Sequence, residues 1–548
     1  MSRTVPDSKP AEIIGKVEKL RASFDTGKTL SYEWRHAQLK ALLCMCKENE
    51  TVIAKALNED LGRGQFEAIA LELVPVYMEI EHALGALAQW MKPVPCATPL
   101  GMCPSMSEVH NVPFGVALII SPFNYPMSLC FGPLVGAIAA GNTCLIKPSE
   151  MTPSCEAVIS QILPKYMDTD CIDVIFGGIE PTKCVLAQHF DKIFFTGSTR
   201  VGKIVMKAAA ENLTNITMEL GGKSPCIVDK SCTNMDLAVK RILWGKFCNS
   251  GQTCIAPDYM LVHEDVYEEF MDAANARLLA AYGEDPSASP DYCRLVTEMH
   301  CKRMESLSSQ ALAAGATIGN TASAAGTPNP SKETSPKGRG KSPARKPLPA
   351  AAGSVDVRVS ERYCAPTFLT GITTKNWDKF DVMKEEIFGP LLPIIKCSAK
   401  DFENIPAIVN KIHKHPLALY IFSKNRTQVD NIMKHAPSGG AVSNDVVYHF
   451  ANGNLPFGGI GPSGMGCCHG EHNFACFSHN KAVMRRDDHT ILDIPQRYPP
   501  YNDFSLTLFR LNAKLPNMPY ISNRFFKTTV ALGVVAFAVY EAFLLKWL

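Results

Sequence analysis

The chain has 548 residues, of which 46% are hydrophobic and 20% are charged. This length predicts two or three domains rather than one simple core, and a net charge of +2 gives no reason to expect a nucleic-acid partner. The 20 cysteines form neither a disulfide framework nor Cys-x-x-Cys pairs at zinc spacing, and the polar start lacks a signal peptide, so we expect reduced thiols, no metal and a cytosol-facing protein.

The first ninety or so residues are predicted to be helical. Ile13, Val17 and Leu20 recur at spacings of four and three, which places them on one helix face. Two longer apolar periodic runs follow, over residues 34–57 and 69–90, and each predicts a further helical segment.

From residue 116 the pattern changes to short apolar runs. Val116–Ile120 lies between turn residues, as a buried parallel strand does. Three similar runs follow at Thr143–Ile146, Ile172–Phe176 and Lys192–Phe195. Because helix-like stretches such as 127–140 alternate with them, the order predicts a doubly wound α/β domain.

A second α/β region begins near Glu219 and is interrupted by residues 321–353. This segment consists almost entirely of Ala, Gly, Ser, Thr, Pro, Lys and Arg. Such a composition buries too little apolar surface to offset the entropy of ordering, so we predict a disordered insertion. Its basic residues indicate a solvated loop, with attraction to anionic lipid as the alternative.

The C-terminal tail differs from the rest of the chain. Residues 528–545 are apolar except for Thr528, Thr529 and Glu541, and as a helix they would extend about 27 Å, enough to cross a hydrocarbon core. Basic residues precede the run, whereas only Lys546 follows it, which leaves the bulk of the protein in the cytosol. Glu541 favours the alternative of a buried or surface-lying helix, since a carboxylate in lipid is costly. We predict a membrane anchor at 528–548.

The first motif that carries chemistry begins at Gly197 and Ser198. It follows an apolar strand and opens a helix, where backbone N–H groups can hold phosphate. The spacing from Gly197 to Lys203 approaches a nucleoside-triphosphate P-loop, but Ile204 stands where a magnesium-binding hydroxyl is needed. The motif alone is equally typical of a plain strand–helix turn.

Three further residues are candidates for catalysis. Glu219 precedes two glycines and could act as a general base in a dry site, although a surface glutamate before a turn is the simpler interpretation. Cys254 ends the small, polar segment Asn249–Cys254, unlike an inert buried thiol. Asn124 follows the first strand and could donate to an oxyanion, or simply cap a turn. We interpret Cys248, Cys467 and Cys468 as packing or incidental thiols.

Together these segments resemble the aldehyde dehydrogenase superfamily over about residues 10–485. The resemblance rests on seven motifs in the family's order: the Asn124 loop, Lys147-Pro148-Ser149-Glu150, Phe195-Thr196-Gly197-Ser198, Glu219-Leu220-Gly221-Gly222-Lys223-Ser224-Pro225, Gly251-Gln252-Thr253-Cys254, Glu385-Glu386-Ile387-Phe388-Gly389-Pro390 and Leu455-Pro456-Phe457-Gly458-Gly459. Asn124-Tyr125-Pro126 and Ser463-Gly464-Met465-Gly466 are similar to class 3, and the hydrophobic extension is similar to its membrane-bound branch, the fatty aldehyde dehydrogenases.

The resemblance implies a covalent mechanism. The Cys254 thiolate would attack the aldehyde, the Asn124 amide and the Cys254 N–H would hold the oxyanion, and Glu219 would activate the water that hydrolyses the thioester. The implied substrate is a long-chain, lipid-derived aldehyde. A CoA-acylating semialdehyde dehydrogenase and a membrane-tethered, non-catalytic family member remain as alternatives. The presence of Glu219 counts against the first, and the complete catalytic set counts against the second.

The resemblance also implies a dinucleotide site. Lys147 and Glu150 would bind the adenosine ribose, and Glu386 the nicotinamide ribose. The other implied cofactor residues are Gly197, Ser198, Gly202, Leu220 and Phe388. A glutamate at position 150 should accept from a ribose 2′-OH and repel a 2′-phosphate, which favours NAD, with NADP as the alternative.

The fold implied is a Rossmann-like cofactor domain with a catalytic α/β domain and a small β arm that forms a homodimer. We assign residues 1–95 and 119–217 to the cofactor domain and 218–435 to the catalytic domain. The arm comprises 96–118 and 436–485, and a C-terminal extension at 486–527 precedes the anchor. We expect a tail-anchored protein, with the endoplasmic reticulum as a candidate membrane.

Overall fold

The computed structural model describes residues 5–99, 102, 105–320, 353–486, 497–514, 517–518, 529, 533 and 536. The predicted insertion at 321–353 lies outside these residues except for Gly353, and the predicted anchor at 528–548 lies outside them except for three positions. Within the described part, the helices are too short or too polar to span a membrane. Both features remain predictions.

The chain forms two compact units, which are described separately. Unit 1 comprises Met1–Gly85 and Gly115–Phe477, and unit 2 comprises Ala86–Phe114 and Ser478–Leu548. Unit 2 contains an antiparallel sheet in the order β1-β3-β19, in which β19 pairs with β3 from Ser478↔Pro113 to Arg485↔Met106. Its elements are β1 (Val94–Cys96), β2 (Thr98–Pro99), β3 (Met106–Pro113), β19 (Ser478–Arg485), α17 (Asp503–Asn512) and β20 (Asn517–Met518).

The N-terminal helices of unit 1 confirm most of the predicted pattern. Helix α1 (Pro10–Asp25) buries Ile13, Val17 and Leu20. The helical run predicted over 34–57 is confirmed but is divided in two, because α2 (Tyr32–Glu48) ends and α3 (Glu50–Leu61) begins at Asn49. The Asn49 side-chain amide donates to the Met45 carbonyl at 2.8 Å, so a side chain that bonds the backbone of the preceding helical turn marks the break between the two helices. The remaining helices before residue 91 are α4 (Gln65–Ala68), a π-turn at Ile69–Leu73 and α5 (Val74–Trp90).

The first sheet of unit 1 has the strand order β18-β8-β7-β4-β5-β6. All neighbours are parallel except β18, which pairs antiparallel with β8. The strand predictions at 116–120, 143–146, 172–176 and 192–195 are confirmed. The bounds are β4 (Val116–Ile120), β5 (Thr143–Lys147), β6 (Ile172–Val174), β7 (Lys192–Thr196), β8 (Asn215–Glu219) and β18 (Gly464–Met465), with α6 (Ser128–Ala140), α7 (Pro153–Tyr166), α8 (Ile179–Leu186), α9 (Thr199–Glu211) and α16 (Gly470–Cys476) around them.

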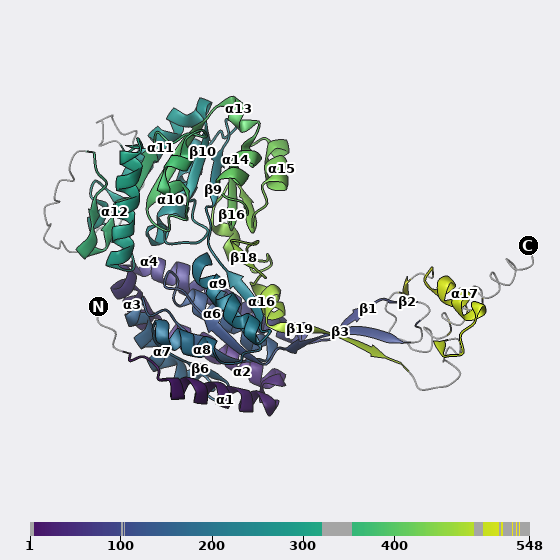
Figure 1. Ribbon diagram of the computed structural model, residues 1–548. Coiled ribbons are helices and arrows are strands. Elements are labelled where there is room, and N and C mark those ends of the chain that lie inside the picture. The colour runs from purple at the N-terminus through teal and green to yellow at the C-terminus, as the bar shows by residue number, and fades with distance from the viewer. Residues whose placement is uncertain are drawn as a thin grey trace, which may run out of the picture. The chain divides into compact units, whose positions relative to one another are not determined.

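Helices cover this sheet on both faces (Figure 1). Leu118, Ile193 and other alternate strand residues pack with α1, α8 and α9 in one apolar cluster. Ala117 and Ile119, which point to the opposite face, are also fully buried, and α6 contacts β4 and β5. Burial on both sides explains why the strands are continuous apolar runs.

The second sheet of unit 1 has the order β11-β14-β15-β10-β9-β16-β17 and is parallel except for β11. Its strands are β9 (Pro225–Val228), β10 (Tyr259–His263), β11 (Thr317–Ile318), β14 (Thr367–Thr370), β15 (Leu391–Cys397), β16 (Ala418–Phe422) and β17 (Gly440–Ser443). Near it lie α10 (Met235–Phe247), α11 (Tyr267–Tyr282), α12 (Glu298–Ala313), α13 (Ala399–Phe402), α14 (Ile405–Ile412), α15 (Arg426–His435) and the hairpin β12 (Val357–Arg358) and β13 (Tyr363–Cys364).

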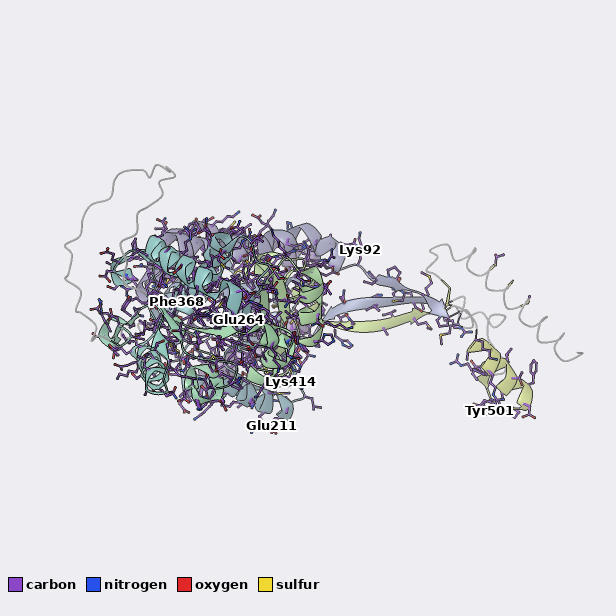
Figure 2. All side chains as sticks on the ribbon, turned by 90° about the horizontal axis from the view of Figure 1, so that it is seen from above. Lys92, Glu211, Glu264, Phe368, Lys414 and Tyr501 are labelled. Carbon is purple, nitrogen blue, oxygen red and sulfur yellow. The ribbon has the colours of Figure 1, made fainter. Side chains whose placement is uncertain are left out.

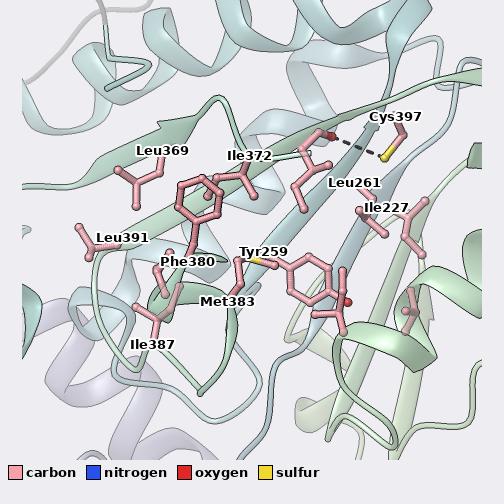
Figure 3. Packing of buried hydrophobic residues seen from close by; sticks show 14 of the residues in the cluster. Ile227, Tyr259, Leu261, Leu369, Ile372, Phe380, Met383, Ile387, Leu391 and Cys397 are labelled. Carbon is pink, nitrogen blue, oxygen red and sulfur yellow. Dashed lines mark hydrogen bonds between the residues drawn. The ribbon is translucent and has the colours of Figure 1, made fainter. Parts of the chain in front are cut away.

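The core beside the second sheet also holds the loop that precedes β15. Phe380, Met383 and Ile387 from this loop belong to the same buried cluster as Tyr259 and Leu261 of β10 (Figure 3). Side chains fill the space between the ribbons, while charged residues such as Glu211 and Lys414 lie on the surface (Figure 2). Met383 and Ile387 therefore fix the backbone on either side of Glu386, one of the predicted cofactor residues.

The strand order of the first sheet also defines where a ligand can bind. The chain runs from β4 outward to β5 and β6, then returns to β7 on the other side of β4. Connections therefore leave the carboxyl ends of β4 and β7 in opposite directions. The crevice at such a reversal is where open α/β sheets bind ligands.

Candidate active site

The predicted site residues gather where the two sheets of unit 1 meet. Asn124, Lys147 and Glu219 lie at or just beyond the carboxyl ends of strands in the first sheet. By contrast, Cys254 and Glu386 lie in segments that precede strands β10 and β15 of the second sheet. The amino ends of the second sheet thus complete a site that the carboxyl ends of the first begin.

Cys254 follows a tight left-handed turn. Asn249, Ser250 and Gly251 have consecutive φ angles of 50°, 52° and 74°. A Cβ atom at Gly251 would collide with the carbonyl of Gly389, so only glycine fits there. The buried Gln252 side chain then bonds the backbone of Asn249, Arg294 and Val296 at 2.9–3.1 Å. The loop before Cys254 is therefore held firmly.

The Asn124 loop is tied directly to the Cys254 loop. The Asn124 side-chain amide donates to the Gln252 carbonyl at 3.0 Å, and the Asn249 amide donates to the Asn124 carbonyl at 2.8 Å. The Tyr125 hydroxyl bonds Thr253 at 2.7 Å. Because an amide nitrogen carries two hydrogens, one N–H of Asn124 remains for a further acceptor. These contacts hold the Asn124 loop beside the loop that leads to Cys254.

A buried ion pair that we did not predict supports this junction. Arg63 and Glu72 are fully buried and paired, and Arg63 also donates to the Asn124 carbonyl and, at 3.3 Å, to the Asn249 side chain. Glu72 accepts from the Ser128 backbone N–H at 2.7 Å. The pair therefore joins the N-terminal helices to both loops of the site.

Replacing Arg63 with methionine is expected to lower the free energy of unfolding by about 3–5 kcal/mol, because Glu72 would be left buried and unpaired. Urea denaturation measures the change. The matched control is Lys183→Met, which removes the exposed Lys183–Glu180 pair and should leave stability nearly unchanged. The double variant Arg63→Met/Glu72→Met should recover part of the loss. Equal stability of Arg63→Met and the wild type would contradict this account.

Glu219 ends β8 and is only 5% exposed. One carboxylate oxygen lies 3.9 Å from the Cys468 sulfur, and the other, Oε2, is buried with no hydrogen-bond partner among the described residues. Burial raises the pKa of Glu219 well above its usual range, and the Cys468 thiol partly opposes that rise. Once ionised, a desolvated carboxylate with a free oxygen is suited to accept a proton from water.

Glu386 is held from both sides. A Cβ atom at Gly221 would collide with its carboxylate, so a side chain there would displace the carboxylate from this position. Burial raises the pKa of Glu386 to about 8, with Asp258 adding to the rise and the Gly222 N–H and Lys223 opposing it. Lys223 pairs with Asp258 and donates to the Val382 and Glu385 carbonyls at 2.8 and 2.9 Å. Lys223, which lies in a predicted motif, and Asp258, which we did not predict, therefore fix the Glu386 loop.

Cys254, Glu219 and Glu386 influence one another electrostatically. Desolvation raises the pKa of the Cys254 thiol far above its usual range, and the negative charges of Glu386 and Glu219 raise it further. The backbone N–H groups of Cys254 and Ile255 oppose the shift. Cys254 still keeps part of its surface open to solvent. The sulfur can thus meet a substrate but needs help to lose its proton.

The predicted cofactor residues form a second group along the carboxyl ends of β5, β7 and β8. The buried Lys147 amine bonds Glu150 at 3.1 Å and the Pro148 carbonyl at 3.0 Å. Ser198 caps α9 by accepting from the Val201 N–H. The preceding Gly197 donates its backbone N–H to the Glu219 carbonyl at 3.0 Å.

Two details of this group fit a bound dinucleotide. The Thr196 hydroxyl, at the end of β7, is buried with no hydrogen-bond partner in the part of the chain that the structure describes. A Cβ atom at Gly202 would press on Leu220, so glycine lets the first turn of α9 lie close to the end of β8. A helix N-terminus with free backbone donors is suited to a pyrophosphate.

Phe388 adopts a left-handed φ of 50° and stacks edge-on against Phe123, with ring centroids 5.7 Å apart. Phe123 in turn contacts His300 at 5.0 Å. A bulky residue at positive φ is strained, and such strain persists where the surroundings impose it. Phe388 thus lies against Phe123 of the Asn124 loop, whereas its predicted contact with a nicotinamide remains a prediction.

Comparison with known proteins shows to which family this fold belongs. The model of the aldehyde dehydrogenase family matches residues 1–332 and 349–483. The dimeric NADP-preferring aldehyde dehydrogenase of Canis lupus familiaris is 38% identical over 485 residues, which cover 88% of this chain and 97% of that protein. Aldehyde dehydrogenase family 3 member A2 of Rattus norvegicus is 38% identical over 489 residues, covering 89% and 91%.

A solved structure agrees with these matches. The substrate-bound AldH of Staphylococcus aureus is 38% identical, covers 92% of this chain and 99% of its own, and superposes with a TM-score of 0.80. The predicted resemblance, the aldehyde dehydrogenase-like α/β fold and the assignment as an NAD(P)-dependent enzyme are confirmed. This chain belongs to the aldehyde dehydrogenase family.

Proposed function

We propose that this enzyme oxidises an aldehyde to a carboxylic acid through a thiohemiacetal and a thioester on Cys254. The observation that carries the proposal is the convergence of Cys254 with Glu219, Glu386 and Asn124, which come from four separate segments. One thiol among 20 would be unremarkable, but the charges of two carboxylates act on this one, and its loop accepts a hydrogen bond from the Asn124 amide at the Gln252 carbonyl.

The first step is attack of the Cys254 thiolate on the aldehyde carbon, after the thiol has released its proton to the solvent that reaches its partly exposed surface. The carbonyl oxygen gains negative charge as the carbon–sulfur bond forms. The remaining N–H of Asn124 and the backbone N–H of Cys254 are the donors for that oxygen, and one such donor typically lowers the barrier by about 3–4 kcal/mol. The oxygen then re-forms its double bond to carbon as hydride leaves, which gives the thioester.

Glu219 acts in the second step. Its free Oε2 accepts a proton from water, the resulting hydroxide adds to the thioester carbonyl, and the Cys254 thiolate departs. This requires ionised Glu219, so hydrolysis should rise with pH as the carboxyl with its raised pKa loses its proton. A CoA-acylating enzyme would not require this base, which is why Glu219 favours hydrolysis over acyl transfer to CoA.

The residues at the strand ends suit NAD or NADP. Lys147 and Glu150 would hold the adenosine ribose, and Glu386 with Phe388 would hold the nicotinamide end. The pyrophosphate would lie at the Gly197–Gly202 turn beside Leu220, where the Thr196 hydroxyl is unpaired. When bound, the nicotinamide would take up the hydride that leaves the substrate carbon.

Glu150→Gln is expected to shift cofactor preference toward NADP by about tenfold, because the change removes a negative charge that repels a 2′-phosphate. The ratio of kcat/KM for NADP to that for NAD measures the shift. Glu180→Gln, an exposed carboxylate on α8, serves as the control and should leave the ratio unchanged. An unchanged ratio in Glu150→Gln would show that Glu150 does not face the ribose.

We further propose a lipid-derived, long-chain aldehyde as substrate and a homodimer bound to membrane by the C-terminal tail. The support is the apolar sequence at 528–545, because long-chain aldehydes partition into membranes. One relative, from Staphylococcus aureus, is named a 4,4'-diaponeurosporen-aldehyde dehydrogenase. Two tails on one dimer would bind far more firmly than one, since the second insertion is intramolecular.

The function is tested by incubating the purified protein with a short-chain and a long-chain aldehyde, with NAD and NADP in parallel. We expect reduced cofactor and carboxylic acid to form without added CoA, with the higher kcat/KM for the long chain. A strict requirement for CoA would favour the acylating alternative. No oxidation of any aldehyde with either cofactor would favour the non-catalytic alternative.

Deleting residues 528–548 is expected to move the protein from the membrane pellet to the supernatant when cells are fractionated. The full chain should sediment with membranes and resist extraction by high salt, because its attachment is hydrophobic rather than electrostatic. Deleting only 321–352 tests the alternative of basic attraction to lipid. Sedimentation that survives loss of the tail would contradict the anchor.

A further inference from the structure

We propose that Cys468 is a positioning residue for Glu219, which holds the carboxylate ionised and aimed for the hydrolysis of the thioester. The inference rests on the proposed function, since it assigns a partner to the proposed base. The sequence suggested nothing of this, and Cys468 was interpreted as a packing thiol.

The contact between the two side chains is specific. The Cys468 sulfur lies 3.9 Å from Glu219 Oε1, and both side chains are buried. Among the described residues this is the one side-chain hydrogen bond that Glu219 makes, and Oε2 has none. A bond to Oε1 alone fixes the carboxylate while leaving Oε2 free to meet a water molecule.

Backbone hydrogen bonds hold Cys468 beside Glu219. Strand β18 pairs with β8 through Gly464↔Glu219, so the two segments run side by side. Cys468 then forms a two-way bridge with Phe457, with N–H···O distances of 2.8 and 3.0 Å. A Cβ atom at Gly458 would collide with the Gly466 carbonyl, so the two segments lie too close for any other residue there. The thiol is thus anchored on both sides.

The pKa shifts of Glu219 and Cys468 indicate what this thiol does for the carboxylate. Burial raises the pKa of Glu219, which favours the neutral carboxyl that cannot act as a base. Burial also raises the pKa of Cys468 well above its usual range, so the thiol keeps its proton and remains a donor. A hydrogen bond to the charged form favours that form.

Among the described residues, the other groups around Glu219 do not supply a positive charge that replaces this donor. Cys254, Cys467 and Cys476 each sense the Glu219 charge, and burial raises the pKa of each, but a thiol or a thioester carries no positive charge. Glu79 lies beyond Cys468 and bonds Gly470 and Asn473 instead. Lys192 acts on Cys467 and Cys476 and bonds Asn215 and Thr217.

The test compares Cys468→Val, which removes the donor at similar volume, with Cys468→Ser, which keeps a donor. Stopped-flow measurements would separate the initial burst of reduced cofactor from the steady rate that follows it, between pH 6 and pH 10. Cys468→Val should move the rising limb of the steady rate about one pH unit toward alkali and slow the steady rate about tenfold near neutral pH. The burst rate should hardly change, because acylation does not use Glu219, whereas KM should fall together with the steady rate, because hydrolysis of the thioester limits turnover.

Cys468→Ser should restore most of the wild-type pH profile, and the neighbouring control Cys467→Ser should match the wild type. If Cys468→Val does not fold, Cys468→Ala carries the same expectation, because alanine also lacks a donor. A wild-type pH profile in Cys468→Val or Cys468→Ala would overturn the inference. Failure of the proposed function is a different result, since then the wild type itself would show no burst.

Discussion

Cys254→Ala is expected to lower aldehyde oxidation by at least about 10⁴-fold, with no burst of reduced cofactor. The loss should be this large because both covalent stages form on one sulfur atom, and no other group in the site can replace it. Stopped-flow absorbance of reduced cofactor measures the effect at saturating aldehyde.

Cys248→Ala is the matched control, because that thiol lies in the same loop. The Cys248 thiol is buried and donates to the Gly245 carbonyl at 3.7 Å, so it is not open to a substrate as Cys254 is, and its loss should change kcat little. Thermal unfolding of both variants separates lost chemistry from lost structure. Turnover in Cys254→Ala within tenfold of wild type would exclude a thioester at this position.

Glu219→Gln is expected to uncouple the two stages. Glutamine keeps the shape of the side chain but cannot accept a proton, so the steady rate should fall by about 10²–10⁴-fold. Acylation should persist, which leaves a burst of about one reduced cofactor per site. Intact-protein mass spectrometry should then find the acyl group on Cys254, where the wild type shows little.

The pH dependence of the steady rate is a second test of Glu219→Gln. In the wild type the steady rate should rise with pH as Glu219 ionises, and Glu219→Gln should lack that limb. Glu386 is the alternative base, because its pKa is raised to about 8 and it also faces Cys254. A normal steady rate in Glu219→Gln, together with its loss in Glu386→Gln, would transfer the role to Glu386.

The sequence predicted best those features whose physics is local. Val116–Ile120 is buried on both faces, so its apolar run was visible without any knowledge of its neighbours. Asn124, Glu219 and Cys254 were found because the family resemblance joined motifs that are individually weak. The helical run over 34–57 is divided at Asn49, and the apolar periodicity gave no sign of that break, because it depends on one side-chain amide that donates to the Met45 carbonyl.

Features that depend on distant partners could not be predicted from the sequence. Arg63 and Glu72 look like surface charges, since nothing near them in sequence shows that each will be buried against the other. Asp258 is equally hidden, because it acts through Lys223 on a loop more than a hundred residues further along. Cys468 differs from the other cysteines only through its contact with Glu219.

The pairing of β8 with β18 also sets a condition on biosynthesis. Glu219 and Cys468 are separated by 249 positions. Strand β8 therefore lacks its antiparallel partner β18 until the ribosome has synthesised the chain as far as residue 465. At typical synthesis rates of about 5–20 residues per second, that interval is roughly 12–50 s. During it β8 presents an unpaired edge next to the future base, and unpaired edges are sites of aggregation. Nascent chains that stop before residue 464 should therefore depend most strongly on chaperones. They should also lack thioester hydrolysis, even though Cys254 has already been made.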